Sequence, residues 1–160
     1  MPETPGTPTS VQDRLRSARK ALLVNERVTL EIPGYSGLFA HYRILDFPET
    51  RAVGKGIEKA GIKDEVQREL YQAADTLLAA SIGVEAHIDG DIVDLGMKLG
   101  NGLAEYLDLG ACENDRQAVF AIFLTKGDVM DQFVELQSHK AYADREADKA
   151  LLGESEAVGS

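Results

Sequence analysis

The sequence predicts an α+β fold that is mainly α-helical, with an N-terminal antiparallel β-hairpin and a candidate for a short second hairpin. Apolar and polar side chains alternate over residues 27–32 and again over 38–45, with a glycine-containing turn between them, as in two paired strands. Apolar side chains recur every three or four residues over 64–82, which is the spacing of one helix face. Asp89–Gly90 separates two short apolar runs and indicates the turn of the second hairpin.

The N-terminal segment is predicted to join this fold only loosely. Residues 1–9 contain three of the five prolines and are expected to be disordered. Ser10 can cap a helix over 11–23 that is basic in its centre and poor in large apolar side chains. We expect this helix to dock weakly, or only on a partner. A single α+β domain is expected over 10–142, followed by a flexible acidic tail over 143–160.

The second strand of the first hairpin is predicted to have two different faces. Successive side chains point to opposite sides of a strand, so the apolar even-numbered positions should face the core. The odd-numbered positions then face outward, away from the core. Whether these side chains reach solvent or another helix covers them is left open by the alternation. The predicted inward set is Leu38, Ala40, Tyr42 and Ile44.

The outward positions supply the candidate binding residues. Aromatic side chains beside an arginine are typical of interface hot spots, and Phe39, His41 and Arg43 fall on the outward side. Tyr35 in the turn is a further exposed aromatic candidate. Phe120 lies off the inward stripe of its own helix, where it is either core or contact. These five residues are the predicted partner-binding site.

Helices are predicted wherever a cap precedes an apolar stripe. Asp46 can cap a helix that ends at Gly61. Asp64 and Gln67 have capping-box spacing at the start of the next helix, whose stripe continues to Ile82 and is expected to pack most extensively. Two more helices follow, the first capped by Asn114 or Asp115 and the second by Asp128, whereas the glycines of 97–110 leave that segment ambiguous. The side chains expected to face inward are Val119, Ile122 and Phe123 in the first and Val129, Phe133 and Leu136 in the second.

Ser36, His41 and Asp46 are the residue types of a hydrolase triad, but their pattern does not fit one. The sequence around Ser36 misses the G-x-S-x-G elbow because Leu38 replaces the second glycine. His41 and Asp46 would lie roughly 16 Å apart on an extended strand. We therefore predict no catalytic residues here.

Metal and phosphate sites are also not predicted. His87, Asp89, Asp91 and Asp94 do not match the calcium-loop pattern, and the plain interpretation is a polar hairpin turn. The glycine-rich stretches at 54–56 and 96–102 lack the G-K-[ST] ending of a phosphate loop. No cofactor is expected. The sequence therefore favours a non-enzymatic binding or assembly protein.

Charge and cysteine content narrow the class of protein further. The formal net charge of −10 disfavours a nucleic-acid binder or a protein attracted to anionic membranes, since both rely on basic surface. Cys112 is the single cysteine, which excludes an internal disulfide and a cysteine zinc cluster. No signal-peptide pattern opens the chain and no apolar run reaches the roughly 20 residues of a membrane span. We expect an intracellular protein.

Four segments of the chain resemble the tail assembly chaperones of actinobacterial siphophages. The order and spacing of a strand ending in Y-R, a long helix, a polar D-G turn and a late A-V-x-x-[IL]-F helix are similar to that family. Family members often carry a tryptophan in the last helix; this chain has none, and Phe133 would fill that role. The resembling segments are GLFAHYRILDFPE, ELYQAADTLLAASIGVEAHIDGD, LGNGLAEYLDLG and DRQAVFAIFLTKGDVMDQF.

The resemblance implies a function in tail assembly in the cytoplasm of the bacterial host. Such a chaperone would bind the long tape measure protein, keep it soluble and help tail tube subunits collect around it. A holdase needs exposed apolar surface and a net charge that keeps its complex soluble. Self-association stays open. Two alternatives remain: a structural virion protein of the tail or head–tail junction, and a small enzyme or regulator unrelated to phage.

Overall fold

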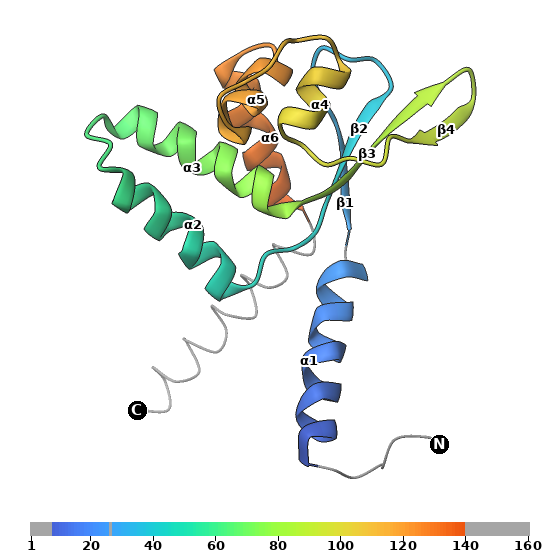
Figure 1. The fold of residues 1–160 in the computed structure, drawn as a ribbon, viewed down its shortest axis with the longest axis vertical. Helices are drawn as coiled ribbons and strands as arrows, with labels where there is room; N and C mark the ends of the chain where they lie inside the picture. Colours follow the sequence, from blue (N-terminus) through green and yellow to red (C-terminus); the bar gives the residue numbers. More distant parts are fainter. Residues whose placement is uncertain (1–7, 26, 140–160) are drawn as a thin grey trace.

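A computed structural model describes residues 8–25 and 27–139 of the 160-residue chain. In this part the fold is α+β, with six helices and one four-stranded antiparallel sheet in the order β1-β2-β3-β4, which confirms the predicted class. The two hairpins lie side by side in the sheet, and helices cover one of its faces (Figure 1). The elements are α1 (Pro8–Asn25), β1 (Val28–Glu31), β2 (Leu38–Tyr42), α2 (Phe47–Ala60), α3 (Glu65–Ala80), β3 (Ser81–Ile88), β4 (Asp91–Asp94), α4 (Asn101–Tyr106), α5 (Asp115–Ile122) and α6 (Lys126–Ser138).

The first hairpin forms as alternation predicts. Val28 pairs with Tyr42 and Leu30 with Ala40, and all four side chains are buried in the core together with Leu38. Burial along β2 alternates between buried and half-buried positions. The hairpin therefore presents its even-numbered side chains to the helices and the others to the opposite side of the sheet.

Helices α2 and α3 begin at the predicted caps. The Asp46 carboxylate accepts a hydrogen bond from the backbone N–H of Glu49 at 2.9 Å. The backbone N–H of Asp46 in turn donates to the Glu49 carboxylate, which completes a capping box. Asp64 caps α3 by accepting the N–H of Val66. The predicted capping box with Gln67 is wrong, because the Gln67 amide donates to the Tyr71 hydroxyl instead.

Helix α3 is shorter than its apolar stripe predicts. It ends at Ala80, and Ser81 begins β3 without an intervening loop. Ile82, predicted as the last helical residue, lies in β3 together with Gly83. Pairing with β2 takes over at this point, since Tyr42 is the register partner of Ser81. As expected, α3 is a central packing element and contacts α2, α5 and α6.

The second hairpin is present and joins the first. Asp89 and Gly90 form its turn, both with positive φ, at 51° and 84°, the backbone that a two-residue hairpin turn requires. The ends of β3 and β4 project beyond the rest of the sheet (Figure 1). Its paired strands carry Ile88, Ile92 and Val93 as exposed apolar side chains.

The C-terminal helices pack on the inner face of the sheet. Asn114 caps α5, and Val119 and Ile122 are buried as predicted. The cap of α6 is Thr125 rather than Asp128; Asp128 is the third helical residue of a capping box with Thr125. The predicted assignment was one turn late. The ambiguous segment 97–110 contains a single short helix, α4, which packs against α5.

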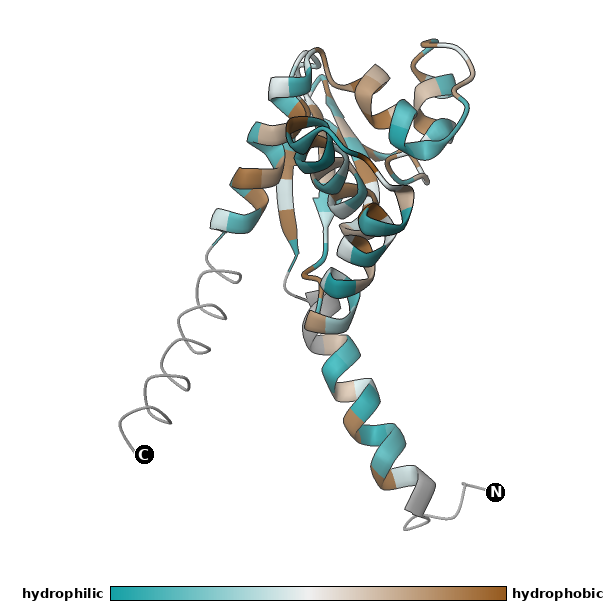
Figure 2. Cartoon of the chain, turned by 90° about the vertical axis from the view of Figure 1, so that its left-hand side faces the viewer, coloured by the Kyte–Doolittle hydropathy of each residue, from teal (hydrophilic) through white to brown (hydrophobic). Residues whose placement is uncertain are grey.

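Helix α1 extends away from the other helices at the lower end of the sheet (Figure 1). It begins at Pro8, two residues before the predicted Ser10 cap. Most of its length is hydrophilic, with separate apolar positions (Figure 2). None of the described helices combines the length and apolar character needed to cross a membrane. Nearly all of the predicted tail 1–9 and the whole tail 143–160 lie outside the described residues.

Candidate interaction site on the outer face of the sheet

The sheet face that points away from the core carries the candidate site. We call it the outer face. Its side chains occupy the odd-numbered positions of β1 and β2, those of β3 from Gly83 onward and the facing positions of β4, as the strand register requires. Phe39 and His41 keep part of their surface in solvent, so the described helices do not bury this face. The outer face consists of Thr29, Glu31, Phe39, His41, Gly83, Glu85, His87, Ile92 and Asp94.

An aromatic pair forms one end of the outer face. The rings of Phe39 and His87 lie with their centroids 4.4 Å apart at 39°, within the range of favourable ring contacts. Ile92 is the register partner of His87 and is 67% exposed. Phe39, His87 and Ile92 thus form a contiguous apolar and aromatic strip across β2, β3 and β4.

A polar network lies beside this strip. The Thr29 hydroxyl is 2.8 Å from His41 Nδ1, and His41 Nε2 contacts the Glu85 carboxylate. His87 Nε2 lies 3.4 Å from the other Glu85 oxygen. In the neutral imidazole, Thr29 donates to Nδ1 and Nε2–H donates to Glu85. Both ring nitrogens of His41 are therefore engaged, and its orientation is set.

The groups Thr29, His41 and Glu85 follow the hydroxyl–imidazole–carboxylate order of a hydrolase triad. Nucleophilic catalysis also needs donors placed for an oxyanion, and in α/β-hydrolases the nucleophile sits on an exposed strand-to-helix turn. Thr29 instead lies within a regular strand opposite His41. The contacts of this network fix the orientation of the His41 ring on the outer face.

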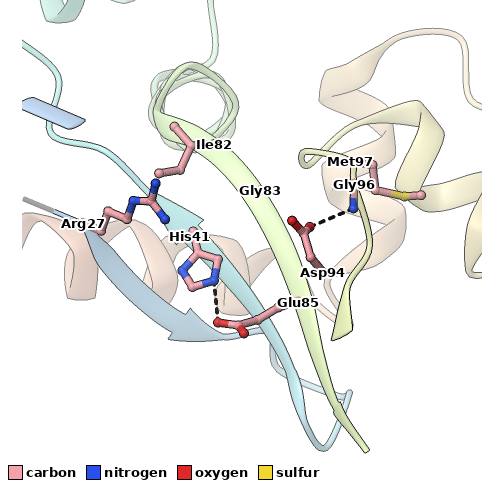
Figure 3. A pocket seen from close by; sticks show the side chains of 8 residues that line it. All are labelled: Arg27, His41, Ile82, Gly83, Glu85, Asp94, Gly96 and Met97. Carbon is pink, nitrogen blue, oxygen red and sulfur yellow. Dashed lines mark hydrogen bonds and ion pairs between the residues drawn. The ribbon is translucent and has the colours of Figure 1, made fainter. Parts of the chain in front are cut away.

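A cavity of about 330 Å³ opens between this network and β4 (Figure 3). Gly83 supplies its floor, and a Cβ atom placed on Gly83 would meet no atom within 4 Å. Asp94 accepts the Gly96 N–H at 2.9 Å and makes no ion pair with any described residue. The lining residues are Arg27, His41, Ile82, Gly83, Glu85, Asp94, Gly96 and Met97.

Arg43 lies past the end of β2 and is held by α2. Its guanidinium forms a two-pronged contact with Glu49, with Nη1 2.8 Å from Oε1. The hydrogen bonds from Arg43 lower the pKa of the Glu49 carboxyl, against partial burial that would raise it. Arg43 therefore joins the sheet to the α2 cap.

Tyr35 and Phe120 lie apart from the outer face. Tyr35 is half-buried against the core, in the turn between β1 and β2. Phe120 is also half-buried and contacts the ring of Tyr71 on α3, at 5.9 Å between centroids. Of the five predicted partner-binding residues, the structure brings only Phe39 and His41 together. Binding by any of the five stays a prediction.

The rejected constellations are also dispersed. His41 contacts Thr29 and Glu85, whereas Asp46 caps α2 and Ser36 is exposed in the β1–β2 turn. Within residues 8–25 and 27–139, no group of three or more histidine, cysteine, aspartate or glutamate side chains could hold a metal ion.

Glu85, His87 and Ile92 were not predicted as part of the site. The signal that could have found two of them is the alternation of apolar and polar residues over 84–88, which is compatible with Glu85 and His87 on one face of a strand. Nothing local indicated that this strand pairs with β2, so the contacts with Phe39 and His41 could not be foreseen. Comparisons of the chain with protein families, with curated proteins and with solved structures found no match.

Proposed function

We propose that this chain is a non-enzymatic phage tail assembly chaperone that binds the tape measure protein in the host cytoplasm and promotes assembly of the tail tube. The four resembling segments lie along the described fold: one spans β2, one runs from α3 into the second hairpin, one includes α4 and one covers α5 and most of α6. The resemblance thus concerns the packed part of the chain rather than its ends.

The observation that carries the proposal is the apolar and aromatic strip of Phe39, His87 and Ile92. A holdase captures an aggregation-prone chain through apolar surface that its own fold leaves accessible. Here that surface is supported by the network of Thr29, His41 and Glu85, so it requires little ordering on binding. The large negative net charge would help to keep the complex soluble.

The direct test is co-expression of this chain with the tape measure protein of the same phage. We expect the soluble fraction of the tape measure protein to rise when the chain is present and the two proteins to co-purify. A tape measure protein that is equally soluble with and without the chain would refute the chaperone function.

Two substitutions test whether the outer face is the surface that binds the tape measure protein. Ile92→Asp adds a charge to an exposed position of the strip and should abolish co-purification while leaving the melting transition in place. Ile88→Asp is the matched control, because Ile88 is similarly exposed on the opposite face of the same hairpin. Equal loss in both variants would place tape measure binding elsewhere than on the outer face.

The alternative of a structural subunit is separated by the composition of purified particles. A chaperone leaves before the virion is complete, so its peptides should be absent or present in traces. Peptides at the level of a tail or head–tail subunit would favour the structural alternative.

A further inference from the structure

The tip of the second hairpin exposes a second apolar surface, distinct from the outer face. Ile88 is the register partner of Asp91, and Val93 that of Ala86, so Ile88, Asp91 and Val93 share the hairpin face opposite Ile92. Ile88 is 58% exposed and Val93 45%. We call these three residues the hairpin tip face. Two large apolar side chains are thus left in solvent beside a carboxylate.

Helix α1 carries the complementary features. Val11 is 56% exposed and Leu15 67%, and Ala18 continues the same helix face at the i, i+4, i+7 spacing. Arg14 borders this stripe, since it lies three residues after Val11 and four before Ala18. The stripe packs on nothing in the described part of the chain; the salt bridge of Arg19 with Asp46, at 3.0 Å, lies to one side of it.

The two surfaces have opposite charge. The hairpin tip face carries Asp91, with Asp89 at the adjoining turn, and residues 85–94 contain no lysine or arginine. Helix α1 holds Arg14, Arg16, Arg19 and Lys20 against the single carboxylate of Asp13. Against a chain of net charge −10, α1 is therefore a local basic element. Complementary charge favours encounter and selects the partner surface.

The spacing of the apolar side chains also matches. Val11 and Leu15 are about 6 Å apart along the helix axis, and a diagonal cross-strand pair such as Ile88 and Val93 is separated by about 7–8 Å. Helix α1 leaves the lower end of the sheet, whereas the hairpin projects at the upper end (Figure 1). The two surfaces of one copy therefore do not meet.

We propose that the Val11–Leu15 stripe of α1 docks on the hairpin tip face of a second copy of this chain. The contact is head-to-tail, because it joins two different surfaces. A docked pair keeps one free hairpin on the first copy and one free α1 on the second, so association continues into an open chain or closes into a ring. The outer face, with Ile92, takes no part in the contact.

Sedimentation velocity of the full-length chain tests this association without any tape measure protein, so its failure and the failure of the chaperone function are separate results. We expect the wild-type chain to form a concentration-dependent series of oligomers at low salt. The weight-average size should fall at high salt, where screening weakens the attraction between α1 and the hairpin.

Two single substitutions should each leave a monomer. Leu15→Asp places a charge in the α1 stripe, and Ile88→Asp places one in the hairpin tip face. The matched controls are Ser17→Asp, which puts the same charge off the stripe of α1, and Ile92→Asp on the opposite hairpin face. Both controls should associate as the wild type does.

Mixing the two monomeric variants is the decisive measurement. The Ile88→Asp copy keeps an intact α1 and the Leu15→Asp copy keeps an intact hairpin, so one α1 can dock once. We expect a 1:1 dimer and nothing larger. A mixture that stays monomeric would overturn the proposal, and so would a monomeric wild type at low salt or an equal loss of association in the controls.

A charge reversal covers the case in which an aspartate unfolds either variant. Arg14→Glu with Arg16→Glu should weaken association, and Asp91→Lys in the partner copy should restore part of it. Restoration supports contact between these surfaces, and its absence contradicts it.

Discussion

The hydroxyl of Tyr42 donates a hydrogen bond to the side-chain oxygen of Gln132 at 3.0 Å, across 90 residues of sequence. Both side chains are almost completely buried. The Gln132 amide in turn donates to the Glu31 carbonyl at 3.2 Å. One polar side chain on α6 thus satisfies groups on β2 and on the edge strand β1, and it couples the last helix to the first hairpin.

Removal of either partner should destabilise the fold. Tyr42→Phe leaves the Gln132 oxygen without its donor, and Gln132→Leu leaves both the Tyr42 hydroxyl and the Glu31 carbonyl unsatisfied. An unsatisfied buried polar group costs about 1–3 kcal/mol, so we expect losses in this range for Tyr42→Phe and larger ones for Gln132→Leu. Urea denaturation measures both. The double variant should lose less than the sum of the two; strict additivity would argue against the bond.

The free energy of unfolding should depend on alkaline pH because Tyr42 is buried. Desolvation raises the pKa of the Tyr42 hydroxyl far above its ordinary value. Below about pH 10 the group is protonated in both states; above it, only the unfolded state loses the proton, so the free energy of unfolding falls by about 1.4 kcal/mol per pH unit. Tyr42→Phe removes this part of the decline, whereas Tyr106→Phe at an exposed site should not. Parallel pH curves for wild type and Tyr42→Phe would contradict the expectation.

Acid should weaken the link between β2 and α2. The hydrogen bonds from Arg43 hold the pKa of Glu49 below its ordinary value, so Glu49 contributes stability above its unfolded pKa of about 4.3. That contribution is lost as the pH falls through the lower folded pKa. Melting temperatures between neutral and acid pH should fall less steeply for Glu49→Gln than for wild type. Glu58→Gln on the exposed side of α2 serves as the control, and an identical slope in Glu49→Gln would contradict the link.

Gly37 should tolerate alanine much less well than Gly90. Both have φ of 84°, where a side chain costs about 1–2 kcal/mol. A Cβ atom at Gly37 would also lie 2.6 Å from the His87 carbonyl oxygen, whereas one at Gly90 would meet nothing within 4 Å. We expect Gly37→Ala to destabilise by clearly more than Gly90→Ala in paired urea titrations. Equal losses would show that the turn does not press on β3.

Local patterns in the sequence were enough for most of the elements. The caps at Asp46, Asp64 and Asn114 and the Asp89–Gly90 turn depend on neighbouring residues, and each was predicted. The end of α3 was not predicted. The apolar stripe has the same pattern whether its last residues continue the helix or enter a strand. Cross-strand pairing of β3 with β2 decided between them, and that information is not local.

Only the part of the site that lies on β2 was predicted from the sequence. Alternation placed Phe39 and His41 outward, and both lie on the outer face. Their partners Glu85 and His87 come from a strand more than 40 positions later, by the numbering of the chain, and follow from the order of the sheet. Arg43 also alternates outward, yet the start of α2 provides Glu49 to bind it, a contact that depends on how the chain turns at Asp46.

Helix α3 ends at Ala80 and strand β3 begins at Ser81. The number of residues at this junction therefore determines which side chains of β3 face the core. Strand faces alternate with a period of two, and no loop separates helix from strand to absorb a change. One residue inserted there would turn Gly83, Glu85 and His87 toward the helices and push Val84 into water. Insertions should therefore be accepted at the Asp89–Gly90 turn and rejected at Ala80, however conservative the inserted residue is.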